Sequence, residues 1–204
     1  MNKVLIFGIG GFVGEYLARE FATHGYKVYG SDIKENYILE KVEYEASNIL
    51  DKEAVKRLIT KIQPTHIINL AAISNVGLSW NIPQETISVN VNGMLNILDA
   101  ARKCDRIPRI LLIGSSEEYE IADGPINEEH TLNANNPYGI SKIMQEKLSN
   151  LYRERYEMKI FHARPFNHTG IGQTDTFVLP SFCKQVAEIQ KAKKSGTIYV
   201  GNLS

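Results

Sequence analysis

Tyr138 and Lys142 are separated by four positions, a spacing that on a helix places both side chains on one face, one turn apart. A phenol has an unperturbed pKa near 10, so it serves as an acid or base near neutral pH only where a cation stabilises the phenolate. Lowering that pKa by ~3 units takes about 4 kcal/mol of preferential stabilisation. The Lys142 ammonium could supply part of this, so the pair predicts proton transfer at Tyr138.

The segment Ser115-Ser116-Glu117-Glu118-Tyr119 precedes this pair and directly follows an apolar, strand-like run at 109–113. Ser115 would then lie at the end of a strand, where its hydroxyl could either cap the following loop or take part in catalysis. Its register with Tyr138 and Lys142 favours the catalytic interpretation.

Three glycines, Gly8, Gly11 and Gly14, lie between the apolar run 4–7 and a helical pattern over 12–24. Missing side chains at such a junction permit a tight turn, close approach of a pyrophosphate and packing of the helix on the strand. A glycine triplet alone could be a simple turn. The order strand, glycines, helix favours a dinucleotide site.

Asp32 ends the next predicted strand, at 27–32. A carboxylate at this position can accept hydrogen bonds from both adenosine ribose hydroxyls and would repel a 2′-phosphate. Asp32 therefore favours NAD over NADP, although a solvated loop acid would also fit the pattern.

These residues need a scaffold, and apolar runs alternate with helical patterns along the chain. Strands are expected at 4–7, 27–32, 66–70, 109–113 and 159–163, and helices at 12–24, 52–62, 84–103 and 138–156. This alternation predicts right-handed βαβ units and an α/β fold with a doubly wound parallel sheet, the NAD(P)-binding Rossmann fold.

The composition limits the possible partners. The 204 residues include 43% hydrophobic and 23% charged residues, enough for a sizeable core, and the 23 basic residues equal the 23 acidic ones. No basic field attracts nucleic acid or an anionic membrane. No apolar run approaches the length of a membrane span and the first residues lack a signal-peptide design, so a cytoplasmic protein is expected.

Metal binding is not expected, because the five histidines are scattered without ligand spacing. Cys104 and Cys183 have neither a partner pattern nor metal-ligand spacing, which fits a reducing compartment. Both cysteines are expected to be small core residues.

The chain resembles the extended short-chain dehydrogenase/reductase family, also called the NAD-dependent epimerase/dehydratase family, which acts on nucleotide sugars. The resemblance rests on the three glycines, Asp32, the segment Asn69-Leu70-Ala71-Ala72, Asn90 and the Tyr138/Lys142 pair. The resemblance covers nearly the whole chain. Within the family, the segments at 114–119 and 164–173 are most similar to the GDP-6-deoxy-D-mannose reductases, also called GDP-4-dehydro-6-deoxy-D-mannose reductases.

The resemblance implies a catalytic role for four residues. Ser115 would hydrogen-bond the reacting sugar oxygen and Tyr138 would donate the proton. Lys142 would bind the nicotinamide ribose and lower the pKa of Tyr138. Glu117 stands where sugar-nucleotide 4,6-dehydratases keep a proton-abstracting glutamate, whereas in a reductase it could bind a sugar hydroxyl.

The resemblance also implies binding residues. Asn48-Ile49 stands where relatives often carry Asp-Ile or Asp-Leu against the adenine, and Asn167 matches an asparagine near the sugar-nucleotide diphosphate. The expected cofactor-binding set is Gly8, Gly11, Phe12, Val13, Gly14, Asp32, Ile33, Asn48, Ile49, Leu70, Ala71, Ala72, Asn90, Tyr138 and Lys142. The expected substrate-binding set is Ser74, Ser116, Asn167 and His168.

The activity that the resemblance implies is NAD(P)H-dependent reduction of the 4-keto group of a nucleotide-linked 6-deoxy sugar, with GDP-4-dehydro-6-deoxy-D-mannose as the favoured substrate. NAD(H) is the preferred cofactor and NADP(H) is possible. Two alternatives stay open: a sugar-nucleotide 4,6-dehydratase or 4-epimerase, and a non-catalytic dinucleotide-binding module.

The expected domains are an NAD-binding Rossmann domain at 1–165 and the beginning of a sugar-nucleotide-binding region at 166–204. Relatives continue beyond a segment like Gly201-Asn202-Leu203, so both a fragment and a natural truncation are open. Helices near 94–101 and 143–151 carry more apolar positions than covering a sheet requires. In this family those helices form a four-helix interface between two copies, which implies a homodimer.

Overall fold

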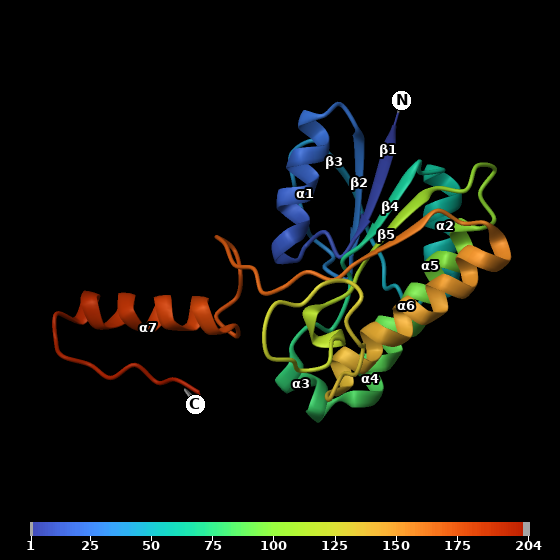
Figure 1. Cartoon of the computed structure of the whole chain (residues 1–204). Coiled ribbons are helices and arrows are strands. Elements are labelled where there is room, and N and C mark those ends of the chain that lie inside the picture. The colour runs from blue at the N-terminus through green and yellow to red at the C-terminus, as the bar shows by residue number, and fades with distance from the viewer. Residues whose placement is uncertain (1, 202–204) are drawn as a thin grey trace. The chain divides into compact units, whose positions relative to one another are not determined.

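The computed structural model describes residues 2–201, and within them six parallel strands form one sheet in the order β3-β2-β1-β4-β5-β6 (Figure 1). The strands are β1 Lys3–Phe7, β2 Lys27–Asp32, β3 Val42–Ala46, β4 His66–Asn69, β5 Arg109–Ile113 and β6 Ile160–Ala163. The predicted α/β fold with a doubly wound parallel sheet is confirmed.

The strand order reverses beside β1. Phe7, at the end of β1, is in register with Ser31 of β2 on one side and with Asn69 of β4 on the other. The chain therefore leaves β1 and β4 at neighbouring points of the same sheet edge. Ligands of open α/β sheets bind at this reversal, outside the carboxyl ends of the strands.

The helices are α1 Phe12–Thr23, α2 Lys52–Ile62, α3 Val76–Asn81, α4 Pro83–Ile87, α5 Gly93–Ala101, α6 Pro137–Tyr156 and α7 Val178–Ala192. A π-helical segment, η1 Ser88–Asn92, joins α4 to α5, and a short 3₁₀ helix, η2 Ser116–Glu118, follows β5. The continuous helix predicted over 84–103 is thus wrong in its interior, where the π-helical segment interrupts it.

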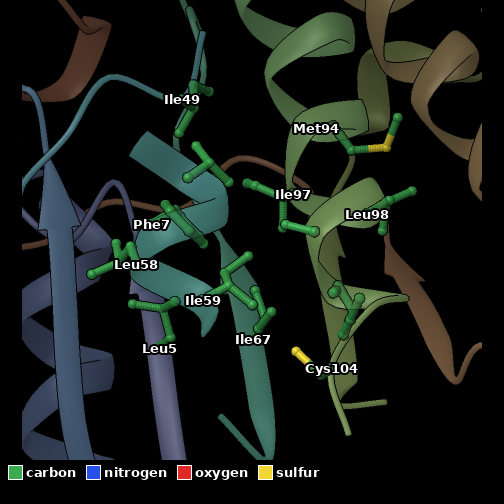
Figure 2. Close-up of a cluster of buried hydrophobic side chains, with 14 of the residues drawn as sticks. Leu5, Phe7, Ile49, Leu58, Ile59, Ile67, Met94, Ile97, Leu98 and Cys104 are labelled. Carbon is green, nitrogen blue, oxygen red and sulfur yellow. The ribbon is translucent and has the colours of Figure 1, made fainter. Parts of the chain in front are cut away.

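The core lies on both faces of the sheet. Successive side chains of β1 point to opposite faces, so Val4 and Ile6 join one apolar cluster with α1 while Leu5 and Phe7 join another. The second cluster includes residues of α2 and α5, among them Leu58 and Ile97, and Figure 2 shows these helices packed over the strands. This burial on both faces explains the unbroken apolar run of β1.

The described chain forms two compact units, with the boundary between Phe166 and Asn167. The second unit contains α7, none of whose residues is buried. Cys183 of α7 is therefore exposed, and its prediction as a core residue is wrong, whereas Cys104 is buried as predicted. Asn202 and Leu203 lie outside the described residues.

Among the described residues, no helix has both the length and the apolar character needed to cross a membrane.

Candidate functional site

The glycine turn after β1 is packed so closely that two of its positions exclude a side chain. Gly8 has φ +76°, and a Cβ there would lie 2.5 Å from the Ala71 backbone nitrogen. A Cβ on Gly14 would lie 2.1 Å from the Ile9 carbonyl oxygen. These glycines let α1 start directly against β1, which places the N-terminus of α1, with Phe12 and Val13, at the carboxyl edge of the sheet.

Asp32 reaches this turn from the end of β2. Its Oδ2 accepts a hydrogen bond from the Gly10 N–H at 3.0 Å, and its Oδ1 accepts one from the Lys34 N–H at 3.3 Å. The carboxylate thus lies beside the glycine turn, as a ribose-binding acid would. The neighbouring Ile33 is 71% exposed.

The loop after β4 forms the other wall. The Leu70 N–H donates to the Phe7 carbonyl at 2.9 Å, and the Ala71 N–H donates to Asn69 Oδ1 at 3.2 Å. The backbone of residues 70 and 71 therefore lies alongside the glycine turn. Ala72 is partly exposed, and Ser74 farther along the loop is exposed.

Asn90 lies in the π-helical segment and supports this loop from behind. Its Oδ1 accepts from the Ile73 N–H at 2.9 Å, and its Nδ2 donates to the Ile73 carbonyl and to Ser141 Oγ. A π-helical turn contains one more residue than an α-helical turn, which changes the direction of the side chains that follow. Here the buried Asn90 amide lies between the loop after β4 and α6. The Asn90 side chain therefore positions the loop after β4 by binding the backbone of Ile73.

Asn48 and Ile49 follow β3. Asn48 Oδ1 accepts from the Leu50 N–H at 2.9 Å, which forms a turn, while Ile49 is buried and joins the core. A contact of these two residues with an adenine stays a prediction.

Ser115, Tyr138 and Lys142 are brought together by β5 and α6. Ser115 caps η2 immediately after β5, and Asn136 caps α6 so that Tyr138 lies in its first turn and Lys142 in the next. All three residues are buried, the Ser115 side chain is close enough to Tyr138 to influence its pKa, and the Lys142 ammonium lies 5.6 Å from the centre of the Tyr138 ring.

Burial is the largest influence on the pKa values of Tyr138 and Lys142. Burial raises the pKa of Tyr138, the Ser115 side chain only partly opposes that rise, and the charges of Glu118 and Glu117 add to it. Burial also lowers the pKa of Lys142 to about 8, and its Nζ donates to the Ile113 carbonyl at 2.7 Å. The pKa of Tyr138 in the polypeptide alone thus lies above its ordinary value because of desolvation, and a lowering of this pKa by Lys142 stays a prediction.

The low pKa of Lys142 predicts a stability that rises with pH. The unfolded chain keeps this amine protonated up to the ordinary pKa of 10.5, whereas the folded chain releases the proton near 8. Between these values the unfolded state binds more protons, so the free energy of unfolding should rise by up to about 3 kcal/mol. Denaturant unfolding at about pH 7 and about pH 10, with Lys142→Met as the reference, measures this term. A difference between the two proteins that is flat or falls with pH would contradict it.

Glu117 lies beside the start of α6. Its Oε2 accepts from Asn136 Nδ2 at 2.8 Å, and Asn136 Oδ1 accepts from the Gly139 N–H at 2.8 Å. A Cβ on Gly139 would lie 2.4 Å from the Glu117 carbonyl oxygen, so the two segments touch. Asn136, which was not predicted from the sequence, thus fixes Glu117 relative to the first turn of α6. Ser116 is partly exposed.

A largely buried charge cluster, whose side chains are at most 16% exposed, lies next to this group and was not predicted; it consists of Glu118, Glu146, His162 and Arg164. Ligand atoms of Glu118, Glu146 and His162 lie within 4.8 Å of one another, close enough to hold a metal ion. The Arg164 guanidinium instead binds Glu146 at 2.8 and 2.9 Å and holds the pKa of that carboxyl below its usual range. Two spacings could have indicated the cluster: His162 and Arg164 are two positions apart near a strand end, and Glu146 is one turn beyond Lys142.

Asn167 and His168 belong to the second unit, where both are exposed. Their assignment to a substrate stays a prediction.

Comparison with known proteins places this geometry in context. Residues 5–204 match the family model described as GDP-mannose 4,6 dehydratase. The chain is 28% identical over 205 residues to GDP-6-deoxy-D-mannose reductase of Pseudomonas aeruginosa, covering 99% of this chain and 64% of that protein. It is 30% identical over 220 residues to GDP-mannose 4,6 dehydratase 2 of Caenorhabditis elegans, covering 98% of this chain and 57% of that protein.

A solved structure of UDP-glucose 4-epimerase from Brucella ovis in complex with NAD superposes with a TM-score of 0.85 at 27% identity. The match covers 92% of this chain and 62% of that one. The chain thus spans less than two thirds of each of these three relatives.

Proposed function

The chain belongs to the GDP-mannose 4,6 dehydratase family, within the NAD-dependent epimerase/dehydratase proteins, and we propose from this that it reduces the 4-keto group of a nucleotide-linked 6-deoxy sugar with NADH. The proposed substrate is GDP-4-dehydro-6-deoxy-D-mannose. The name of the Pseudomonas aeruginosa relative supports this choice. The observation that carries the proposal is the meeting of Ser115, Tyr138 and Lys142 at the sheet edge that also bears the glycine turn.

The residues present fit a dinucleotide. Gly8 and Gly14 let the turn pack closely against the backbone of Ala71 and Ile9, which brings the N-terminus of α1 to the sheet edge where it could hold a pyrophosphate. The Asp32 carboxylate lies beside this turn for a ribose. We assign the rest of the predicted cofactor-binding set to the same site, with the buried Asn90 acting through the loop that it supports. When bound, the reduced nicotinamide supplies the hydride.

The polypeptide supplies the proton and the orientation. Ser115 would donate a hydrogen bond to the ketone oxygen, and the neighbouring Tyr138 would give that oxygen its proton. Lys142 would hold the nicotinamide ribose. The positive charge of the oxidised ring would favour the phenolate left on Tyr138, which burial alone disfavours. Ser74, Ser116, Asn167 and His168 are assigned to the substrate.

A second candidate activity is 4,6-dehydration of a GDP-sugar. Its support is Glu117, whose carboxylate is held by Asn136 next to Tyr138 and could abstract a proton beside a ketone. Such an enzyme, like a 4-epimerase, would recycle tightly bound NAD, whereas a reductase consumes NADH. A third alternative is a non-catalytic dinucleotide-binding module, which would bind NADH without turning over a sugar nucleotide.

Asp32→Ala is expected to weaken NADH binding by about tenfold while NADPH binding changes little or improves. The substitution removes the acceptor for two ribose hydroxyls and the charge that repels a 2′-phosphate. Titrating both cofactors against both proteins measures the change. An equal loss of affinity for NADH and NADPH would count against the ribose contact.

We further propose a cytoplasmic homodimer that uses α5 and α6 as a four-helix interface. Ile140, Met144 and Leu151 of α6 are 41%, 37% and 58% exposed, an apolar stripe at helical spacing. No nucleic acid or membrane partner is proposed, because the net formal charge is zero.

Calorimetric titration of the NADH-loaded chain with GDP-, UDP- and dTDP-linked sugars tests the substrate class. Selective binding of GDP-sugars supports the proposed substrate. If NADH binds and no sugar nucleotide does, the chain is a cofactor-binding module and the proposed activity is wrong for it.

A further inference from the structure

Glu118 is fully buried in η2, and its carboxylate contacts groups of the protein itself. Its Oε1 accepts a hydrogen bond from the Ser115 N–H at 2.8 Å, while Ser115 Oγ accepts from the Glu117 N–H at 3.2 Å. These reciprocal contacts form a capping box. The carboxylate thus holds the backbone of Ser115, whose side chain lies close enough to Tyr138 to influence its pKa.

The carboxylate is itself held by the buried charge cluster. His162 Nε2 lies 3.1 Å from Glu118 Oε1, and Arg164 Nε lies 3.8 Å from Glu118 Oε2. A Cβ on Gly114 would lie 2.1 Å from Glu118 Oε1 and 2.3 Å from His162 Nε2, so the backbone before Ser115 is packed directly on this pair. Glu118 therefore has little room to move.

The cluster also links three elements of the site. Glu118 follows β5, His162 belongs to β6, and Glu146 lies on α6 one turn beyond Lys142. Arg164 bridges them, since it binds Glu146 with two nitrogens and donates to the Tyr119 hydroxyl at 2.7 Å. A displacement within the cluster would shift Ser115 relative to Tyr138.

Stability alone is a weak reason for this arrangement. Removing charges from water costs several kcal/mol per ion, and well-packed apolar residues often stabilise a core as well as a buried ion pair does. A buried, hydrogen-bonded carboxylate does fix a geometry, and misplacing a reacting group by about 1 Å can cost on the order of 100-fold in rate.

We propose that Glu118 is a positioning residue, which sets the location of the Ser115 hydroxyl relative to Tyr138 through its hydrogen bond to the Ser115 N–H. The catalytic part of this proposal rests on the proposed reductase function. The positional part does not, because it concerns only the polypeptide.

The test compares Glu118→Leu with Glu118→Gln in the full chain. Glutamine keeps an oxygen that can accept from the Ser115 N–H, and leucine removes it. We expect Glu118→Leu to abolish hydrogen-exchange protection of the Ser115 amide and to lower kcat by about ten- to 100-fold, with the Kd for NADH within about threefold of wild type. Glu118→Gln should retain the protection and most of kcat. Glu146→Gln, which alters the same cluster without touching Ser115, should keep the Ser115 amide protected.

Two results would overturn the proposal. One is a Glu118→Leu protein that keeps the Ser115 amide protected, and the other is a loss of kcat only in proportion to lost NADH affinity or lost folded protein. If the wild-type chain turns over no sugar nucleotide, the proposed function fails, and the exchange measurement still decides whether Glu118 positions Ser115.

Discussion

Tyr138→Phe is expected to lower kcat by about 10²- to 10⁴-fold while the affinity for NADH stays within about twofold. The substitution removes only the hydroxyl, which is both the proposed proton donor and the partner of Ser115. The ring keeps its buried position in the first turn of α6, where the Lys142 ammonium lies 5.6 Å from its centre. Steady-state turnover with sugar nucleotide and fluorescence titration with NADH separate the two effects.

Tyr152→Phe is the matched control, because it removes a hydroxyl from the same helix. Tyr152 donates to Asp99 at 2.9 Å, remote from the strand ends, so its loss should leave turnover nearly unchanged. If Tyr138→Phe retains more than about a tenth of wild-type kcat, or loses NADH affinity as much as kcat, Tyr138 is not the proton donor.

Gly14→Ala should prevent NADH binding and destabilise the fold by about 2 kcal/mol or more. The added Cβ would lie 2.1 Å from the Ile9 carbonyl oxygen and 2.5 Å from the Ile9 carbonyl carbon, so α1 must move away from the turn. That movement removes both helix packing and the approach of a pyrophosphate to the backbone. Denaturant unfolding and NADH titration measure the two losses.

Gly77→Ala makes the same chemical change in α3, where the nearest atom would be 3.4 Å away. Alanine is the better helix former, so this control should be neutral or stabilising by up to ~1 kcal/mol. Gly14→Ala protein with unchanged stability and NADH affinity would show that the glycine turn is not the close-packed cofactor site proposed above.

Local patterns in the sequence predicted the central part of the fold. Apolar runs identified β1, β2 and β5, and the acid at the end of β2 does reach the glycine turn. β3 was missed because it is an edge strand with exposed Glu43 and Glu45, and so it lacks the apolar run of a strand buried on both faces. The π-helical segment was missed because a change in helical hydrogen bonding leaves the apolar pattern almost intact.

In the candidate site, too, the local part was predicted from the sequence and the part that joins distant segments was not. Spacing along α6 was enough to predict that Tyr138 and Lys142 are neighbours, since it depends on one helix. The cluster around Glu118 joins residues from 118 to 164, and only folding brings them together. Burial likewise sets the pKa of Tyr138 and Lys142, and a sequence does not state how deeply a side chain is buried.

The most direct test of the reductase proposal follows NADH absorbance while the chain is incubated with GDP-4-dehydro-6-deoxy-D-mannose, with Tyr138→Phe as the inactive reference. The proposal predicts that one NADH is oxidised for each sugar reduced, and that GDP-mannose with NAD gives no product. Conversion of GDP-mannose without net consumption of NADH would instead assign the dehydratase reaction to Glu117, and binding of NADH without turnover of either sugar would contradict catalysis by this chain.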